Sequence, residues 1–451
     1  MTLQFQDLGE AVLQTEYAVR GPIVARAGEL ERAGREVIYC NIGNPQALEQ
    51  KPLTYLRQLL ALCQHPALLE QAPGHFPTDV QAAARAVLKG SKHGVGAYSD
   101  SMGIRLIREA VAQFIQERDG IAADPETIWL TDGASKGVQS ALRLLIAGPD
   151  DGVMIPIPQY PLYSATLTLY SGRQVGYFLD EAHGWKLSRA LLEESLEKAR
   201  REGIRVKGIC VINPGNPTGS VLDRENVAMV IGFARDHHLS ILADEVYQEN
   251  VYLQGDSFVS FAKVLEQERE TGVSLFSFHS VSKGFLGECG QRGGYMEARN
   301  VPGEVLAQIT KLQSVSLCAN VNGQVATYAM VRPPKPGEPS HELYARERGA
   351  ILGALRERAA ALVEGLRKIP GVECNVVAGA MYAFPKISLP PGRSDEEYCL
   401  ALLEQTGICV VPGSGFGQLP GTAHFRTTIL PPIEKIRTVV ERFAAFHASY
   451  R

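Results

Sequence analysis

Short apolar runs alternate with helical segments through the middle of this chain. Runs that predict strands lie at 127–133, 152–158, 206–213, 239–247 and 273–281. Segments with apolar residues at helical spacing, at 134–148 and 223–238, lie between some of them. Unbroken apolar strands between helices are typical of a mostly parallel sheet that is covered on both faces. The pattern therefore predicts an α/β fold, in which ligands collect at the carboxyl ends of the strands.

The two ends of the chain have a different pattern of predicted elements. Residues 1–95 are rich in helical segments and loops. A proline-rich joint at 331–341 is followed by a long charged helical pattern at 342–368, and then by short strand-like segments. We therefore expect a large domain over residues 96–330 and a smaller α/β domain, formed by residues 1–95 together with residues 331–451.

Composition and charge exclude several classes of function. The chain has 451 residues, of which 45% are hydrophobic and 21% charged, as in ordinary globular proteins, and a net charge of −4. This balance predicts no strong attraction to nucleic acid or to a membrane. No long uncharged apolar run predicts a transmembrane helix, and the N-terminus resembles neither a signal peptide nor a transit peptide.

The cysteines and histidines suggest no metal site. The eight cysteines are scattered and form no CxxC pair. Free buried thiols in a reducing compartment are the simplest interpretation, so we expect a cytoplasmic protein without a metal. The adjacent His237 and His238 end a helical pattern, where a positive charge suits the helix dipole.

The first predicted strand ends in a turn suited to an anion. In TDGASKG, Gly133, Ala134 and Ser135 open a helix. The free backbone N–H groups of a helix start, together with a hydroxyl, form a phosphate cradle. A serine is also common at helix starts for structural reasons alone, so this turn by itself is a weak signal.

The last predicted strand ends in SFHSVSKG, which places one lysine among small and hydroxylic residues. The amine of Lys283, close in sequence to Ser280 and Arg292, suits a Schiff base to a phosphorylated aldehyde. A guanidinium fork and a serine hydroxyl are suitable ligands for its phosphate.

Three further strand ends carry residues suited to a planar heterocycle. Tyr160 follows the strand at 152–158, where its ring suits either the face of such a ligand or the protein core. The rigid turn INPGNPTG exposes the amide of Asn216. Asp244 ends a buried strand, with Tyr247 three positions later. A buried carboxylate needs a positive partner, and a protonated ring nitrogen would provide one.

Taken together, these segments resemble the fold-type I pyridoxal-phosphate aminotransferases, and within them the alanine aminotransferases. The NPTG and SxxK patterns belong to the broad superfamily, whereas YCNIGNPQ, GECGQRGGYME and HFRTTILP are more specific to the alanine branch and its close relatives. The resemblance covers nearly the whole chain. It implies an aspartate-aminotransferase-like fold with a seven-stranded sheet and the cofactor pyridoxal 5'-phosphate. The implied reaction interconverts L-alanine and 2-oxoglutarate with pyruvate and L-glutamate by a ping-pong mechanism.

The resemblance also implies roles at the cofactor ring. Lys283 corresponds to the Schiff-base lysine, which also carries the proton between the substrate Cα and the cofactor. Asp244 corresponds to the partner of the ring nitrogen. Asn216 and Tyr247 correspond to the donors to the ring's phenolate oxygen, and Tyr160 to the aromatic that stacks on the ring.

The phosphate and the substrate receive further implied ligands. The phosphate ligands implied within the chain are Ala134, Ser135, Ser280 and Arg292. Tyr98 corresponds to a tyrosine that reaches the phosphate of the neighbouring subunit, which implies a homodimer with shared active sites. Arg426 corresponds to the clamp on the substrate α-carboxylate, assisted by Asn216, and Gly43 to the loop that closes over the substrate.

Other functions share part of this pattern. Glutamate:glyoxylate aminotransferases carry the same specific segments, and related lyases carry the same cofactor residues. A transcription regulator with such a domain would need an N-terminal DNA-binding module, where residues 1–95 hold the substrate loop instead. Phe285 and Leu286 follow Lys283 where a second aromatic is expected, and Gln291 replaces a basic or aromatic residue. These departures suggest a change in the shape of the pocket.

Overall fold

The centre of the molecule is a seven-stranded sheet. The computed structural model describes residues 2–17, 21–253, 255 and 257–450. The strands lie in the order β2-β8-β7-β6-β5-β3-β4. Their bounds are Ile128–Asp132 (β2), Asp151–Ile157 (β3), Arg173–Phe178 (β4), Arg205–Ile212 (β5), Ser240–Asp244 (β6), Leu275–Ser280 (β7) and Gly293–Arg299 (β8). Neighbours from β7 to β4 are parallel, whereas β8 is antiparallel to β2 and β7. This confirms the predicted mostly parallel sheet of seven strands.

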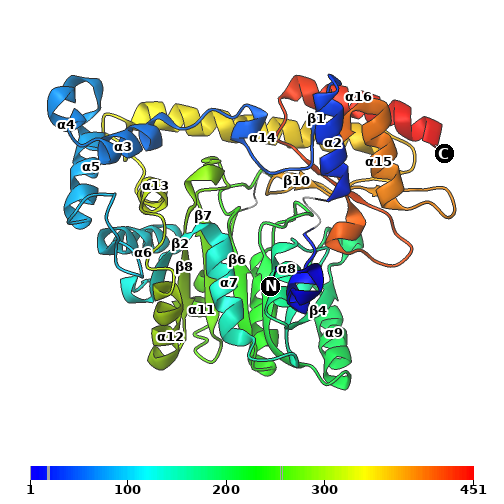
Figure 1. Ribbon diagram of the computed structural model, residues 1–451, viewed down its shortest axis with the longest axis horizontal. Helices are drawn as coiled ribbons and strands as arrows, with labels where there is room; N and C mark the ends of the chain where they lie inside the picture. The colour runs from blue at the N-terminus through cyan, green and yellow to red at the C-terminus, as the bar shows by residue number, and fades with distance from the viewer. Residues whose placement is uncertain (1, 18–20, 254, 256, 451) are drawn as a thin grey trace.

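Helices cover both faces of this sheet (Figure 1). One face packs against α7 (Gly133–Leu145), α8 (Leu162–Leu169) and α12 (Gly303–Ser314). The other face packs against α9 (Arg189–Arg201), α10 (Arg224–Asp236) and α11 (Phe261–Gln267). The two apolar cores enclose the strands, which explains why most of the strands are unbroken apolar runs.

A third core lies at the β2 edge of the sheet. It is formed by α3 (Thr54–Gln64), α5 (Thr78–Gly90), α6 (Arg105–Asp119) and α13 (Val321–Val331). The short helix α4 (Leu68–Gln71) lies beside them at the left of Figure 1. Helices α3 and α5, which precede position 95 in the sequence, thus pack against α6 and α13, which follow it. The domain boundaries at 95 and 330 remain a prediction.

A smaller layer of helices and short strands lies above the carboxyl edge of the sheet (Figure 1). Its helices are α2 (Pro22–Arg32), α14 (His341–Arg367), α15 (Asp395–Thr406) and α16 (Ile433–Tyr450). Its short strands are β1 (Ile38–Tyr39), β9 (Val372–Glu373), β10 (Tyr382–Ala383), β11 (Lys386–Ile387), β12 (Ile408–Cys409), β13 (Val411–Pro412) and β14 (Phe425–Thr428). The parallel pair β1–β12 joins the N-terminal part of the chain to the C-terminal part.

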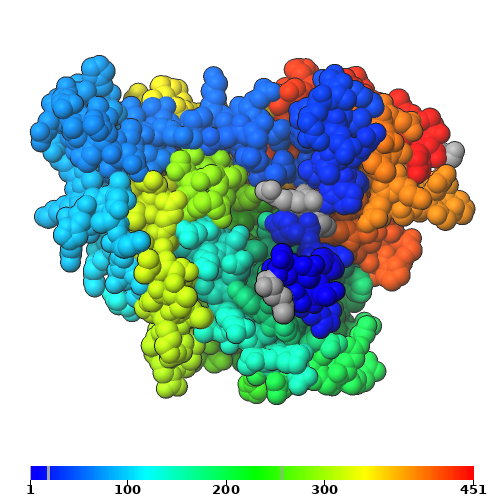
Figure 2. Space-filling view, viewed as in Figure 1, coloured from blue at the N-terminus to red at the C-terminus, as the bar shows by residue number. Residues whose placement is uncertain are grey.

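The N-terminal segment lies on the face shown in Figure 2, below the smaller layer. Its short helix α1 (Glu10–Leu13) contacts α8 of the large sheet layer. Among the described residues, no helix combines the length and the apolar character needed to cross a bilayer. Within the same ranges, no cluster of three or more His, Cys, Asp or Glu side chains is arranged to hold a metal ion.

Candidate active site

A cavity of about 310 Å³ lies at the carboxyl ends of the strands, beneath the smaller layer. Eleven of the twelve predicted site residues line it: Gly43, Ala134, Ser135, Tyr160, Asn216, Asp244, Tyr247, Ser280, Lys283, Arg292 and Arg426. Larger grooves of about 700 and 770 Å³ lie elsewhere and contain none of the twelve. The structure therefore brings together residues from almost the whole length of the chain.

Lys283 reaches into this cavity from the turn that follows β7. Its Nζ donates a hydrogen bond of 2.8 Å to the carbonyl oxygen of Gly43. Gly43 belongs to the loop after β1, and a Cβ there would lie 1.9 Å from the Tyr382 hydroxyl. Only a glycine therefore allows this loop to approach the lysine and the tyrosine so closely.

Asp244 lies at the end of β6, buried beneath the cavity. The Tyr163 hydroxyl donates to its Oδ2 at 3.0 Å, and the Val246 N–H donates weakly to Oδ1 at 3.4 Å. Burial raises the pKa of Asp244 to about 6, despite these donors and the Lys283 charge. No described lysine or arginine forms an ion pair with this carboxylate, and a protonated ring nitrogen in the cavity would supply a close positive partner.

The helix start predicted as a phosphate cradle lies beside Arg292. Its Nη2 donates to the Asp132 carbonyl oxygen at 3.0 Å, and its Nη1 donates to the Ser282 hydroxyl at 3.3 Å. Gly133 has φ +70°, and a Cβ there would lie 2.5 Å from Arg292 Nη2. Arg292 itself has φ +51°, an uncommon conformation for a residue with a side chain. The backbone is thus shaped to bring one guanidinium against the N-terminus of α7.

Arg426 lies on β14 at the opposite side of the cavity and is 1% exposed. Its guanidinium carbon lies 4.2 Å from the centre of the Tyr382 ring and 4.7 Å from that of Phe416. It donates to Asn216 Oδ1 at 3.3 Å and to the Asn41 carbonyl oxygen. Its buried Nε has no acceptor among the described residues. A carboxylate entering the cavity is the acceptor that this geometry suits.

Several residues of the cavity were not predicted from the sequence. Tyr382 comes from β10, Tyr17 from the N-terminal segment and Cys289 from the turn before Arg292. Burial favours the neutral phenol of Tyr382, but the Lys283 and Arg426 cations outweigh it and lower the pKa of this hydroxyl. The Tyr17 hydroxyl lies 2.8 Å from that of Tyr160. No local pattern marks these tyrosines, because they approach the site only through the tertiary fold.

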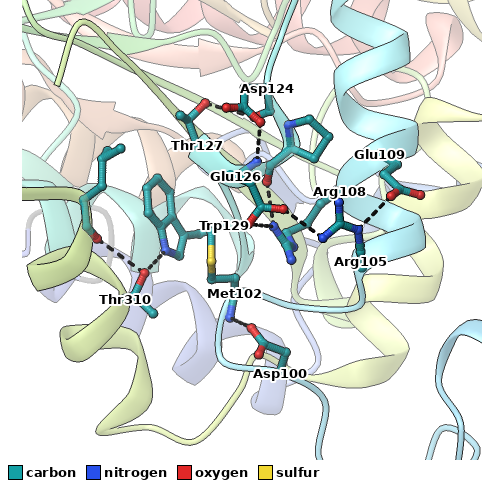
Figure 3. A network of polar contacts seen from close by, with 12 residues as sticks. Asp100, Met102, Arg105, Arg108, Glu109, Asp124, Glu126, Thr127, Trp129 and Thr310 are labelled. Atoms are coloured by element: carbon teal, nitrogen blue, oxygen red, sulfur yellow. Dashed lines mark hydrogen bonds and ion pairs between the residues drawn. The ribbon is translucent and has the colours of Figure 1, made fainter. Parts of the chain in front are cut away.

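Tyr98 is the one predicted residue outside the cavity. Its side chain is 77% exposed, on a loop that leads to α6. Asp100 accepts a hydrogen bond from the Met102 N–H at 2.8 Å, and Met102 accepts one from Leu130 of β2. Figure 3 shows Asp100 and Met102 beside Trp129. The loop is therefore tied to the sheet, while Tyr98 is exposed and does not line the cavity of its own chain.

The residues near Lys283 that depart from the family pattern do not line the cavity. Phe285 and Leu286 are buried in the core at the β2 edge, where Phe285 packs edge-to-face on Tyr344. Gln291 is also absent from the cavity wall. None of the three forms part of the cavity surface in this structure.

The cavity fits a phosphorylated, planar, nitrogen-containing aldehyde. It combines an anion cradle with an arginine, a carboxylate buried without an ion pair to any described residue, and a lysine amine, all at the carboxyl edge of a mostly parallel sheet. Fold and site together define a pyridoxal-phosphate enzyme of fold type I.

Comparison with known proteins narrows this class. The family model for aminotransferase class I and II matches residues 69–443. A probable mitochondrial alanine aminotransferase of Dictyostelium discoideum is 48% identical, over 100% of this chain and 89% of the relative. Glutamate–glyoxylate aminotransferase 1 of Arabidopsis thaliana is 47% identical, over 99% of this chain and 96% of the relative. An alanine aminotransferase structure from Pyrococcus furiosus superposes with a TM-score of 0.80 at 26% identity, over 98% of this chain and 100% of that one.

The chain belongs to the class I and II aminotransferases, within their alanine aminotransferase branch. It is therefore a transaminase, and its cofactor is pyridoxal 5'-phosphate.

Proposed function

We propose that this enzyme transfers the amino group between L-alanine and 2-oxoglutarate, giving pyruvate and L-glutamate by a ping-pong mechanism. The observation that carries the proposal is the convergence of Lys283, Asp244 and Arg426 on one cavity. The relatives from Dictyostelium discoideum and Arabidopsis thaliana that are named alanine aminotransferases favour alanine as the amino donor.

In this proposal Arg426 binds the α-carboxylate that all amino acids share. Its unpaired Nε and one terminal nitrogen form the fork, while Asn216 and the Asn41 carbonyl oxygen hold the guanidinium in place. The Gly43 loop covers the substrate from the side of the smaller layer. Because this clamp is common to all amino acids, the side-chain pocket must select alanine and still admit glutamate.

The bound cofactor supplies an aldehyde carbon and an electron-withdrawing ring. Lys283 anchors the cofactor and its Nζ then moves the proton of the substrate Cα. Asp244 would keep the ring nitrogen protonated. Tyr247 and Asn216 would donate to the ring oxygen, and Tyr160 would pack on the ring.

In this proposal the phosphate is held by the start of α7 and by Arg292. The backbone N–H groups of Ala134 and Ser135, with the Ser135 and Ser280 hydroxyls, complete the cradle. The close approach of Arg292 to Gly133 supports this assignment.

We also propose a homodimer in which Tyr98 of one subunit reaches the phosphate of the other. Val315 and Leu317, in the segment between α12 and α13, are also exposed, at 82% and 53%. Gln324 of α13 donates to Ser99, the residue after Tyr98. Exposed apolar side chains in a segment that leads to this helix favour a subunit contact in this region.

A cytoplasmic location is part of the proposal. All eight cysteines are free, and most are buried, as expected in a reducing compartment. The relative from Dictyostelium discoideum is described as mitochondrial, so fractionation of cells that express this chain is the deciding measurement.

The activity is tested by mixing purified holoenzyme with L-alanine and 2-oxoglutarate and assaying pyruvate and glutamate. We expect kcat/KM for alanine to exceed that for aspartate and tyrosine. A tenfold preference for either of these would exclude the alanine assignment while leaving the cofactor chemistry intact.

A second candidate is glutamate:glyoxylate transamination, because the Arabidopsis thaliana relative with that name is nearly as similar. The two assignments differ in the acceptor. A higher kcat/KM for glyoxylate than for pyruvate, with glutamate as the donor, would favour the second candidate.

A further inference from the structure

We propose that His424 is a positioning residue for substrate binding, because it ties the strand that carries Arg426 to the large sheet layer. The inference rests on the proposed role of Arg426 as the carboxylate clamp. His424 belongs to the HFRTTILP segment, in which only Arg426 has so far been given a function.

Both ring nitrogens of His424 face acceptors. Its Nε2 lies 3.1 Å from Glu181 Oε1, and its Nδ1 lies 2.9 Å from Gln418 Oε1. The Gln418 amide is oriented by its own nitrogen, which donates to Asp395 Oδ2 at 3.1 Å. The oxygen of this amide therefore faces the histidine. The His424 ring thus lies between two side-chain oxygens, one from Gln418 and one from Glu181, and can donate a hydrogen bond to them.

The contact between His424 and Glu181 joins the two layers of the molecule. Glu181 begins the short helix η6 (Glu181–His183), which follows β4 of the large sheet. His424 directly precedes β14 of the smaller layer. The Glu181 carbonyl oxygen also accepts a hydrogen bond of 3.0 Å from Asn375, which belongs to the smaller layer as well. The histidine side chain is only 2% exposed and that of Glu181 21%, so solvent screens the pair weakly.

A stack of aromatic rings connects the histidine to Arg426. The His424 ring stacks on Phe384, with centres 4.8 Å apart and planes inclined by 5°. Phe384 packs edge-to-face on Phe416 at 5.9 Å, and Phe416 lies under the Arg426 guanidinium. Phe416 also accepts a backbone hydrogen bond from Gln159, the neighbour of Tyr160. The rings that support the clamp are therefore anchored at His424.

The pair has apolar surroundings on one side, whereas on the other side Glu181 lines a groove that also contains Asp180, Glu194, Glu373 and Lys386. The small cavity beside it is lined by Ile157, Pro158, Phe178, Leu179, Glu181, Trp185, Phe384, Gln418, Leu419 and His424. Apart from the pair itself, no residue in this set is ionisable. Asp395 contacts Gln418 and not the histidine ring. The backbone of Lys386 pairs with that of His424, but the Lys386 amine lies 3.6 Å from Glu373.

Three variants test this role in the holoenzyme. His424→Phe keeps a ring on Phe384 but removes both ring nitrogens, His424→Gln keeps one donor towards Glu181, and Glu181→Gln removes the carboxylate charge. His183→Phe is the matched control, since this exposed histidine pairs with Asp180 on the same short helix and does not reach Arg426.

We expect His424→Phe to raise KM for alanine and for 2-oxoglutarate about tenfold, with kcat changed less than about twofold, the pattern of lost substrate binding. His424→Gln and Glu181→Gln should show smaller increases of the same kind, and His183→Phe none. Adding Glu181→Gln to His424→Phe should give no further increase, since both remove the same contact.

An unchanged KM in folded His424→Phe would overturn the inference. So would a parallel fall in kcat, cofactor affinity and melting temperature, which would indicate a purely structural role. If His424→Phe does not fold, an unchanged KM in Glu181→Gln would have the same meaning. Arg426→Lys separates the two proposals: if it leaves KM unchanged, the assigned clamp is wrong, whatever the histidine variants show.

Discussion

Replacing Gly43 with alanine tests the contact between the substrate loop and the floor of the cavity. The added Cβ would lie 1.9 Å from the Tyr382 hydroxyl oxygen, 2.9 Å from its Cζ and 3.2 Å from Lys283 Nζ. The backbone of Gly43 does not have a positive φ, so alanine introduces steric overlap without backbone strain. Either the loop or the tyrosine must therefore move.

The size of the effect follows from the packing of Tyr382. The side chain is buried, and its ring lies 4.2 Å from the Arg426 guanidinium carbon. Overpacking a filled site costs about 1–3 kcal/mol. Loss of a desolvated cation–π contact costs up to about 2 kcal/mol more. A loss of about 2 kcal/mol in transition-state binding corresponds to about a 30-fold fall in kcat/KM for alanine.

The assay is steady-state pyruvate formation at saturating 2-oxoglutarate. Gly290→Ala is the matched control, because a Cβ at this nearby position meets no atom within 4 Å. The double variant Gly43→Ala/Tyr382→Phe lacks the hydroxyl that is overlapped and should recover part of the lost activity. Near-wild-type kcat/KM in Gly43→Ala, or no recovery in the double variant, would refute the reasoning.

The remaining predictions concern the cofactor ligands. Lys283→Ala should lower kcat by at least about 10²–10⁴-fold, since proton transfer is lost, and turnover near the wild-type rate would contradict the assignment. In the cofactor-free enzyme, burial raises the pKa of Asp244 to about 6. The protonated carboxyl therefore contributes its full stabilisation of the fold below pH ~4, and this stabilisation is lost as the pH rises through 6. In urea titrations, the free energy of unfolding of Asp244→Asn should therefore rise relative to that of the wild type by up to about 3 kcal/mol between pH 4 and 8. Bound cofactor should reduce this difference. A difference that does not change with pH would contradict the prediction. Tyr98→Phe chains mixed with Lys283→Ala chains should form dimers with one unmutated site, more active than either variant alone, whereas an active monomer in sedimentation would refute the shared site.

The fold was predictable where burial leaves a continuous apolar run. All five predicted strands of the large sheet are present, because each packs against apolar cores on both faces. Strands β4 and β8 were missed. The edge strand β4 alternates between buried and exposed positions, and β8 begins with two glycines and buries Glu297 beside Arg299. Neither has the unbroken apolar pattern by which the other strands were recognised.

The residues that line the cavity were predictable where they lie at the end of a strand. Asp244 and Lys283 lie next to the strands that position them, so the pattern of the chain marks them directly. Tyr382 and Tyr17 enter the same cavity from segments that are distant in sequence. Sequence patterns describe neighbours along the chain, and only the packing of the two layers brings these tyrosines to the cavity.

Two segments specific to the alanine branch, YCNIGNPQ near the N-terminus and HFRTTILP near the C-terminus, form one structural unit. The Thr428 N–H of β14 donates to the Cys40 carbonyl oxygen at 2.9 Å, and Arg426 donates to that of Asn41. The loop proposed to cover the substrate and the strand that carries the proposed carboxylate clamp are therefore linked to each other. The proposed cofactor ligands, in contrast, lie mainly on the large sheet layer. If these roles are right, substrate binding depends more on how this unit sits over the sheet than cofactor binding does, so variants at the junction of the layers should change KM more than cofactor affinity.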